Sequence, residues 1–241
     1  MRLDLALVAR GLVPTRARAR DAILRGCVTV DGRAATAPSA AVPAGAEIAV
    51  DDPAGRYVSR AALKLVAGLD AFGYSPAGRV ALDLGASTGG FTEVLLERGA
   101  ERVYAVDVGH DQLHHRLIDH PRIRRRDGLN ARDLTAEHVH GPVGAVVADV
   151  SFISLRLALP PALALTTVGA WGVFLVKPQF EVGREHVGKG GLVRDAAVAR
   201  KAVDAIAAWL AETHGWTVEG VVDSPIAGGD GNREFVLGAR R

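Results

Sequence analysis

From residue 57 onward, short apolar runs recur along the chain, and stretches with helical spacing lie between most of them. Runs that are continuously apolar are typical of strands buried on both faces of a sheet. We expect strands at 79–85, 102–109, 144–152, 172–177, 216–222 and 233–239. A helix capped by Ser59 precedes the first strand. This alternation predicts an α/β domain with a Rossmann-like, doubly wound and mostly parallel sheet.

The first fifty residues follow a different pattern, which predicts a small α+β module. A short helix closes at Gly11, and Thr15 caps a second helix. The alternating run that follows turns at Asp31-Gly32, which indicates a hairpin, and a last short strand occupies 47–50. The stretch "DDPAGR" is a linker by composition. The expected parts are a domain at 1–50, a linker at 51–56 and a domain at 57–241.

One apolar stretch, residues 157–176, is uncharged and long enough to span a bilayer. Its interruptions are Pro160, Pro161, Gly169 and Gly172. We therefore interpret it as a helix opened by the prolines, a turn, and then the strand that ends at residue 177, rather than as a membrane span.

The net charge of +2 gives no overall argument for a polyanionic partner, but the charge is unevenly distributed. Residues 1–33 hold seven arginines and three acids, a net charge of +4, so the rest of the chain carries −2. A basic piece on a near-neutral body favours a nucleic-acid-binding appendage; a solvated helix face is the alternative. The candidate phosphate-binding side chains are Arg16, Arg18, Arg20 and Arg25. The run 122–126 either extends this basic surface or forms a solvated turn.

The single cysteine, Cys27, excludes a disulfide framework and a cysteine-based metal site. The N-terminal stretch carries charged residues and lacks a small-residue cleavage site, so it does not have the pattern of a signal peptide. We expect a cytoplasmic protein with neither a membrane nor a metal as partner.

The first strand of the larger domain ends in "LDLGASTGGF", a glycine-rich turn. Such a turn lets a ligand approach the backbone and aims a helix N-terminus at it. The next strand ends at Asp107, 22 residues after Gly85, where an acid is placed to bind ribose hydroxyls. These features fit either a dinucleotide or S-adenosylmethionine. The candidate cofactor-binding residues are Asp83, Gly85, Ser87, Thr88, Gly89, Gly90, Asp107 and Asp127.

Two details of the turn favour the methyl donor. The glycine spacing is not the G-x-G-x-x-G of dinucleotide sites. Asp83 comes ahead of the glycines, where its carboxylate would hold the ammonium of the donor directly or through water. Asp127, in "RDGLN", would lie beside the adenine; an ordinary Asx turn is the alternative for that segment.

The strand at 172–177 ends in Lys177, which is unusual because an unpaired buried charge is costly. Parallel strands end at one edge of a sheet, so Asp149, after "AVVA", would lie near Lys177 and the glycine turn. Lys64, on the helix before the first strand, and Glu234, at the start of the last strand, would face the same rim. Each alone is an ordinary rim ion pair, but the four together indicate a catalytic constellation.

In this order, Lys64, Asp149, Lys177 and Glu234 resemble the catalytic tetrad of FtsJ-like 2′-O-ribose methyltransferases. The blocks "YVSRAALKL", "LDLGASTGGFTEVLL", "ADVSFISL", "LVKPQFEVGRE" and "GNREFVL" are similar to the TlyA (hemolysin A) family of ribosomal RNA methyltransferases. The N-terminal module resembles the alpha-L RNA-binding fold of a small-subunit ribosomal protein. The likeness covers nearly the whole chain.

The resemblance implies a class I methyltransferase domain that uses S-adenosylmethionine to methylate a ribose 2′-hydroxyl of ribosomal RNA within ribosomal subunits, with cytidine as the target. Lys177 would act on the hydroxyl, either as a neutral base or as an ammonium that stabilises developing alkoxide charge. Asp149 would orient Lys177, and Lys64 and Glu234 would complete the network around the hydroxyl.

Three rival functions are alternatives to this one. An NAD-dependent oxidoreductase would leave the four charged residues and the basic module without a role. A non-catalytic RNA-binding or ribosome-assembly protein would bind the cofactor without turnover. A pore-forming hemolysin needs amphipathic or membrane-spanning segments and an export route, and the sequence shows neither.

Overall fold

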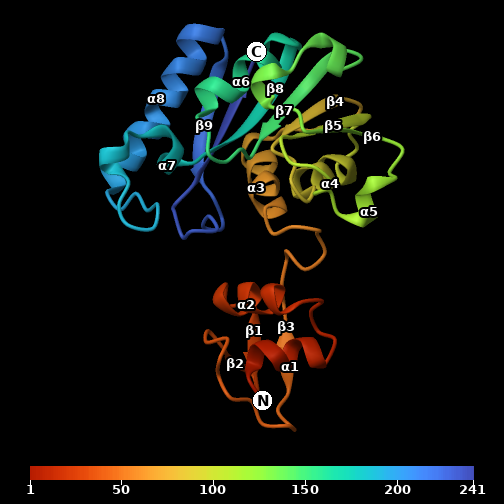
Figure 1. Ribbon diagram of the computed structural model, residues 1–241, viewed down its shortest axis with the longest axis vertical. Helices are drawn as coiled ribbons and strands as arrows, with labels where there is room; N and C mark the ends of the chain where they lie inside the picture. The colour runs from red at the N-terminus through yellow and green to blue at the C-terminus, as the bar shows by residue number, and fades with distance from the viewer. The chain divides into compact units, whose positions relative to one another are not determined.

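The computed structural model describes all of residues 1–241, and the chain divides into two compact units, Met1–Arg56 and Tyr57–Arg241 (Figure 1). Each unit has its own hydrophobic core. No helix in the structure combines the length and the apolar character needed to cross a membrane.

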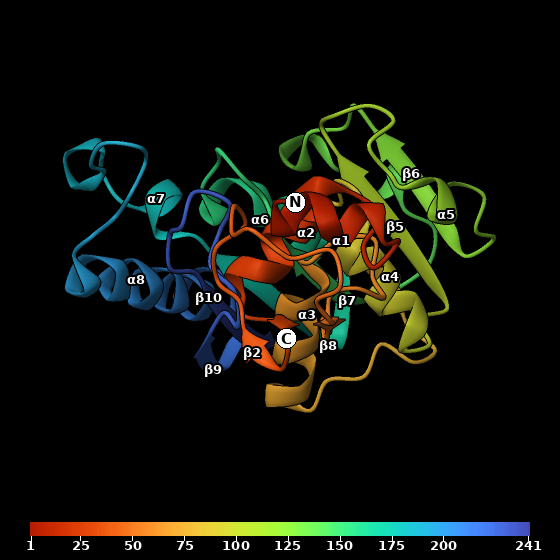
Figure 2. The same cartoon turned by 90° about the horizontal axis from the view of Figure 1, so that it is seen from below.

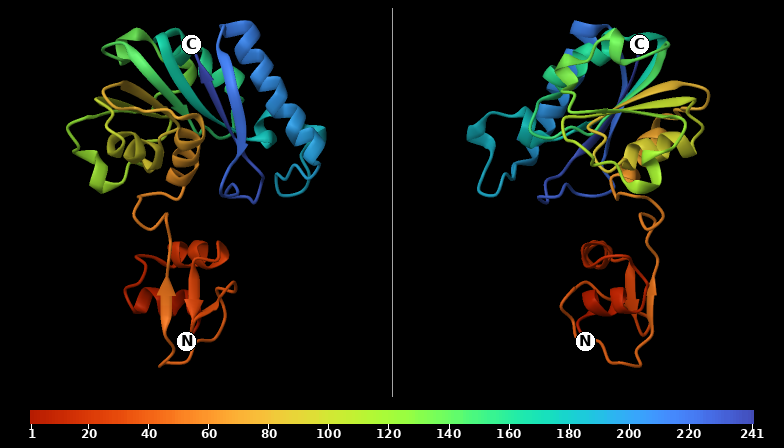
Figure 3. Two further views of the ribbon diagram at one scale, coloured as in Figure 1. Left: turned by 180° about the vertical axis from the view of Figure 1, so that it is seen from behind. Right: turned by 45° about the vertical axis from the view of Figure 1, so that its right-hand side comes forward.

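The N-terminal unit packs two helices on one side of a small antiparallel sheet, as Figure 3 shows. Its elements are α1 (Leu3–Ala9), α2 (Arg16–Leu24), β1 (Val28–Val30), β2 (Arg33–Ala34) and β3 (Ile48–Val50), with the strand order β2-β1-β3. The Thr15 side chain accepts a hydrogen bond from the Arg18 amide, so this threonine caps α2 as its sequence position predicted. Asp31 and Gly32 both have positive φ, as a tight two-residue hairpin turn requires.

The larger unit is built on a seven-stranded sheet with the order β6-β5-β4-β7-β8-β10-β9. The strands are β4 (Val80–Leu84), β5 (Arg102–Asp107), β6 (Ile123–Asp127), β7 (Val143–Ala148), β8 (Thr166–Val176), β9 (Thr217–Asp223) and β10 (Phe235–Arg240). Strands β4 to β8 are parallel, whereas β10 runs antiparallel to both of its neighbours. The predicted doubly wound, mostly parallel sheet is therefore confirmed. Figure 2 shows β6 and β9 at opposite ends of this sheet.

Helices cover both faces of the sheet, because successive strand residues point to opposite sides. One face packs against α3 (Ala62–Phe72), α4 (Gly90–Glu97) and α5 (His115–Ile118). The other packs against α6 (Leu155–Ala164) and the long α8 (Ala196–His214). Short helical turns complete the unit: α7 (Pro178–Glu181), η1 (Ala131–Asp133), η2 (Ala136–His138) and η3 (Arg184–His186). Strand residues are buried on both faces, which explains their continuous apolar runs.

The start of α3 differs from the prediction. Ser59 is not its N-cap: the helix begins at Ala62, and the Ser59 side chain instead accepts from the Ala61 amide in the turn that precedes it. A serine side chain can satisfy a nearby amide in such a turn as well as at a helix start. The sequence signal identified the polar turn but not the first helical residue.

The proline pair and β8 also depart from the prediction. Helix α6 begins at Leu155 under a Ser154 cap, and Pro160 and Pro161 lie inside it rather than at its start. The strand begins at Thr166, earlier than expected, and its pairing register with β7 shifts before Trp171. Gly169 has positive φ and lies inside β8 at this register shift, so it does not form the predicted turn before the strand. Glycine within a strand often marks such an irregularity.

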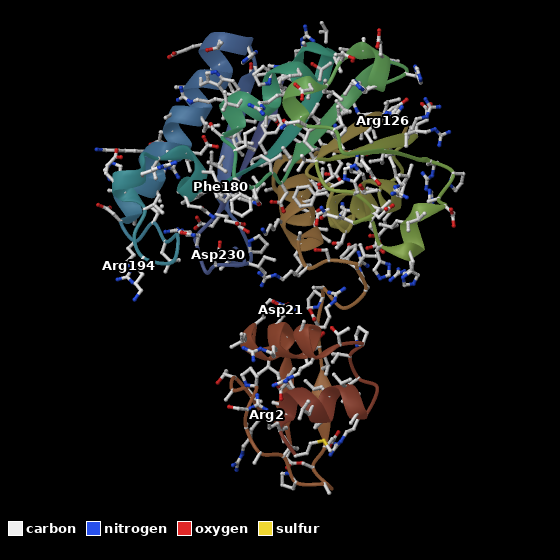
Figure 4. All side chains as sticks on the ribbon, in the orientation of Figure 1. Arg2, Asp21, Arg126, Phe180, Arg194 and Asp230 are labelled. Carbon is white, nitrogen blue, oxygen red and sulfur yellow. The ribbon has the colours of Figure 1, made fainter.

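Strand β6 was not predicted, and of the two alternatives for 122–126 the solvated turn was wrong. Four arginines in five positions hide the alternation that marks a strand. At a sheet edge charged side chains are well tolerated. Arg122 and Arg126 donate to backbone carbonyls of neighbouring segments, and Arg126 also lies over the Tyr104 ring. Figure 4 places Arg126 at this outer edge of the sheet.

Gly68 lies where α3 approaches β8 and β10 closely. An added Cβ would sit 2.7 Å from a Val173 methyl group and 2.8 Å from a Val236 methyl group. Alanine favours a helix over glycine by about 1 kcal/mol, but overpacking a buried site costs about 1–3 kcal/mol. We expect Gly68→Ala to lower the free energy of unfolding. Urea titration followed by tryptophan fluorescence would measure it, since all three tryptophans lie in the larger unit.

Gly229→Ala is the matched control, because no atom lies within 4 Å of the Cβ position of this residue and its φ is not positive. It should change the free energy of unfolding by less than about 0.5 kcal/mol. A Gly68→Ala midpoint equal to or above that of the wild type would contradict the close contact of α3 with the sheet.

Candidate active site

The carboxyl ends of β4, β5, β7 and β8 meet at one edge of the sheet, where ligands bind in open α/β folds. Strand β10 runs in the opposite direction, so its beginning lies at this same edge. Phe235 pairs with Val176, and Glu234 therefore stands beside the end of β8, next to Lys177. The topology brings together side chains from both halves of the larger unit.

Four charged side chains meet at this edge and form a continuous chain. Lys64 Nζ donates to Glu234 Oε2 at 2.6 Å and lies 3.8 Å from Asp149 Oδ2. Lys177 Nζ lies 2.6 Å from Asp149 Oδ1. The exposed fractions of Lys64, Lys177 and Glu234 are only 7%, 8% and 3%. Two cations and two anions balance one another, so none of these buried charges is left uncompensated.

Lys177 has a second polar partner, Ser151. Its Nζ donates to Ser151 Oγ at 2.8 Å, whereas the short contact with Asp149 Oδ1 lacks hydrogen-bond directionality and acts as an ion pair. Ser151 lies in the same loop as Asp149, so one loop supplies both partners. Sequence reasoning missed Ser151, although it stands two residues after Asp149 in the quoted block "ADVSFISL".

The glycine-rich turn after β4 lies directly beside Asp149. Gly85 has a φ of 78°, and an added Cβ would lie 2.7 Å from the Asp149 carbonyl oxygen, so only glycine fits this approach. Ser87 donates its amide to Asp107 Oδ2 at 2.7 Å. Asp107 also accepts from the Gly109 amide at 2.8 Å. The turn is thus fixed between the ends of two neighbouring strands.

A cavity of about 920 Å³ opens at this turn, and a smaller one of about 170 Å³ adjoins it. Gly85, Ser87 and Asp149 line both. Asp107 and Asn130 belong to the larger cavity, and Lys177 to the smaller. The size suits a cofactor, and the glycine backbone with an acid at the next strand end suits a nucleoside. The predicted residues Thr88 and Gly90 line only the smaller cavity.

Three predicted cofactor residues lie away from these walls. A Cβ on Gly89 would meet Leu113 and Leu117, so this glycine serves the packing of α4. Asp127 pairs with Arg125 and borders a narrow crevice beside Asp107. Asp83 is fully buried beneath the turn. Their contact with a cofactor stays a prediction.

Asp83 is a carboxyl group in a site that disfavours its charge. Thr92 donates its hydroxyl to Asp83 Oδ2 at 2.6 Å, while Oδ1 has no partner. Burial raises the pKa of Asp83 to about 7, and the negative charges of Asp149 and Asp107 act in the same direction. The group therefore gains or loses its proton near neutral pH in the folded protein.

Replacing Asp83 by asparagine should change how stability depends on pH. The folded pKa lies above the unfolded value of about 3.9, so stability from Asp83 is fully present below pH 4 and is lost as the pH rises to about 7. Asp83→Asn keeps the size and an acceptor for Thr92 but cannot ionise. We expect the variant to gain stability over the wild type between pH 4 and 7, measured by urea denaturation. A difference independent of pH would contradict this.

The four arginines predicted to bind RNA have unequal surroundings in the N-terminal unit. Arg16 donates to Asp4 at 2.9 Å, and Arg25 pairs with Asp21 and Asp52. Arg18 donates to the Ala54 carbonyl. Arg20 is exposed on α2 and makes no ion pair.

Asp4 is a buried acid that organises part of this unit. Its carboxylate accepts from Arg2 and from Arg16, and the hydrogen bond from Arg2 holds the pKa of Asp4 well below its usual range. The Arg16 guanidinium therefore serves the fold as well as the surface. Sequence reasoning placed it on a helix face but did not detect its partner twelve residues away.

Sequence reasoning also missed two aromatic residues at the larger cavity, Phe152 and Phe180. Their ring centroids lie 5.3 Å apart. Phe152 is 90% exposed and has a φ of 64°, a conformation that costs free energy for an aromatic residue. Phe180 lies on the turn beyond β8, as labelled in Figure 4. Both residues stand in the quoted blocks "ADVSFISL" and "LVKPQFEVGRE". No sequence pattern, however, distinguishes an exposed aromatic residue from a buried one.

Comparisons with known proteins identify the family of each unit. The FtsJ-like methyltransferase model matches residues 57–241, and the S4 domain model matches residues 1–48. The 16S/23S rRNA (cytidine-2′-O)-methyltransferase TlyA of Mycobacterium tuberculosis is 47% identical over 99% of this chain and 89% of its own length. The 23S rRNA (cytidine-2′-O)-methyltransferase TlyA of Campylobacter jejuni is 37% identical over 74% of this chain and 69% of its own length.

A solved structure from Streptococcus thermophilus, which carries the name hemolysin, is also similar. It is 38% identical with a TM-score of 0.77, and the match covers 100% of this chain and 88% of that one. The family match covers the whole larger unit, including the glycine turn and all four charged side chains. The chain belongs to the FtsJ-like methyltransferase family, in its TlyA (hemolysin A) branch, and joins that domain to an S4 domain.

Proposed function

We propose that this protein transfers a methyl group from S-adenosylmethionine to a ribose 2′-hydroxyl of ribosomal RNA, with cytidine as the target nucleotide. The observation that carries the proposal is the chain Glu234–Lys64–Asp149–Lys177, which ends at the cavity beside the glycine turn. The names of the curated relatives support the ribose position and the cytidine.

The residues at the cavity fit the cofactor. Gly85 and Ser87 would cradle it with backbone groups, and Asp107 has further lone pairs for ribose hydroxyls. When bound, the cofactor supplies an electrophilic methyl group on a sulfonium. Asp83 is fully buried beneath the turn, so its carboxylate would not contact the cofactor ammonium directly.

Lys177 is arranged as a donor at the reacting oxygen. Its ammonium has three N–H groups; one donates to Ser151, and Asp149 faces the ammonium as an ion pair. A remaining N–H would face the 2′-oxygen. As this oxygen bonds to the methyl carbon, the carbon–sulfur bond would break and the hydroxyl proton would pass to water, so the ammonium would stabilise the negative charge that develops on the oxygen. A charge held in place before the reaction stabilises the transition state without reorganisation. We therefore favour the ammonium role over the neutral-base role.

Lys64 and Glu234 hold this arrangement in place. Glu234 is nearly inaccessible and its carboxylate pairs with Lys64, which in turn faces the second oxygen of Asp149. Asp149 is thus held between two lysines, and Lys177 cannot rotate away without leaving it. Positioning of this kind supplies much of the rate when two reactants must align.

The outer part of the larger cavity suits an unstacked nucleotide. Phe152, Phe180 and Leu157 give it an apolar surface beyond the polar turn. Proteins that recognise RNA commonly hold unpaired bases against aromatic side chains. The S4 domain would supply affinity through phosphate contacts, which position the RNA without reading its sequence.

Replacing Lys177 by alanine should abolish methylation while the cofactor still binds. Ribosomal subunits from a strain lacking this activity would be incubated with labelled S-adenosylmethionine, and nucleoside mass spectrometry would identify the product. Loss of a preorganised charge at the reacting atom costs roughly 10²–10³ in rate. We expect 2′-O-methylcytidine with the wild type and a loss of at least this size with Lys177→Ala.

Lys201→Ala is the matched control, because Lys201 is exposed on α8 and lies outside the site. It should retain wild-type activity. If the wild type binds the cofactor but methylates neither subunit, the non-catalytic RNA-binding function replaces this proposal. Leakage from liposomes would instead favour the pore-forming function.

The arginines of α2 should separate into two classes when each is replaced by alanine. Arg20→Ala should weaken RNA binding and reduce the slope of log affinity against log salt by about 1. The reason is that a protein with one phosphate contact fewer releases fewer counterions when it binds. Arg16→Ala should also lower the stability of the N-terminal unit, because it leaves the buried Asp4 with one partner fewer. RNA binding across a salt series and thermal unfolding would measure the two effects. Equal unfolding temperatures for both variants would contradict the distinction.

A further inference from the structure

Two segments form one wall of the larger cavity, and they follow neighbouring strands. The first is the loop 149–154, after β7, and the second is the turn 177–181, after β8. Between them the rings of Phe152 and Phe180 lie side by side. This wall carries the aromatic surface of the cavity.

The inner end of the two segments is joined by Lys177, through Asp149 and Ser151. The outer end is joined by Glu181. Its Oε2 accepts from Ser154 Oγ at 2.6 Å, and its Oε1 accepts from the Leu155 amide at 2.8 Å. The loop is therefore fastened at both ends to the same short turn.

The local sequence explains how one turn provides both fastenings. Pro178 follows Lys177 and fixes the start of the helical turn α7. Lys177 is the N-cap of α7 and Glu181 is its last residue, and the side chains of both bond to the loop. The bond from Leu155 to Glu181 satisfies an amide that needs a partner. Leu155 is the first residue of α6, so its amide has no partner within the helix.

The loop needs this second fastening because of Phe152. The left-handed backbone of this residue costs about 1–3 kcal/mol and persists only when the surrounding contacts hold it. Phe152 is 90% exposed, so its own side chain contributes little packing to oppose that strain. The bonds at the two ends of the loop must therefore hold this strained backbone in place.

Resting on the function proposed above, we propose that Glu181 is a positioning residue that holds the loop 149–154 in the conformation that seats the substrate RNA. Glu181 does not line the cavity, so it acts through Ser154 and Leu155 rather than on substrate or cofactor. Burial raises the pKa of Glu181, which is consistent with a structural acceptor enclosed between two segments. The cofactor side of the cavity, at Ser87, Asp107 and Asn130, lies outside its reach.

The test compares Glu181→Ala with Glu181→Gln. Alanine removes both acceptors, whereas glutamine can accept from the Leu155 amide and donate to Ser154. We expect Glu181→Ala to lower the single-turnover methylation rate on ribosomal subunits by about tenfold to a hundredfold, with the Kd for S-adenosylmethionine within about twofold of the wild type. Glu181→Gln should restore most of the rate. Glu185→Ala, an exposed acid a few residues further on, is the matched control and should behave as the wild type.

Hydrogen exchange gives a readout that does not depend on activity. The peptide containing 150–155 should exchange faster in Glu181→Ala and return toward the wild-type rate in Glu181→Gln. If Glu181→Ala does not fold, Glu181→Asp, which keeps the charge but is too short to reach both donors, takes its place with the same expectation.

The outcomes separate the two proposals. Wild-type methylation with an unchanged rate and unchanged exchange in the alanine variant would overturn the role of Glu181. So would equal loss in the alanine and glutamine variants, because glutamine keeps groups that can bond to both Ser154 and Leu155. If the wild type methylates neither subunit, the proposed function fails, and unchanged exchange in Glu181→Ala would still overturn the fastening on its own.

Discussion

The structure depends on a balance of charge at the edge of a buried sheet. Two lysines and two carboxylates lie where little water reaches them, and leaving one partner of a buried pair without the other costs about 3–5 kcal/mol. Lys64 comes from a helix before the sheet, whereas Glu234 directly precedes β10, the last strand along the chain. The charges balance only when the strand order β4-β7-β8-β10 is complete, so the same interaction that assembles the site requires the finished fold.

This balance also explains why the site is rigid on one side and open on the other. The charged side chains have partners on several elements, which leaves them few alternative arrangements. The adjoining cavity, by contrast, is formed by a glycine turn and by loops whose backbones are held at their ends. A fixed set of charges beside an open cavity is suited to aligning a large substrate, such as folded RNA, with a small reacting group.

Arginine has a similar double use in the N-terminal unit. A basic composition suggested a surface for phosphate, yet two of the four arginines on or beside α2 pair with acids of the same unit. A small domain has a limited hydrophobic core, and ion pairs to a buried acid such as Asp4 help define its fold. A count of positive residues therefore overstates the number available to a nucleic acid.

The sequence by itself determined what depends on near neighbours along the chain. The Thr15 cap, the Asp31-Gly32 turn and the apolar runs of most strands are local signals, and the rule that parallel strands end at one edge was enough to bring Lys177 and Asp149 together. Tertiary structure alone decided β6, the burial of Asp83, and the contacts of Ser151 and Glu181. The physical reason is sequence separation: Lys64 and Glu234 are 170 residues apart, and no local pattern records which distant group will satisfy a buried charge or an unpaired amide.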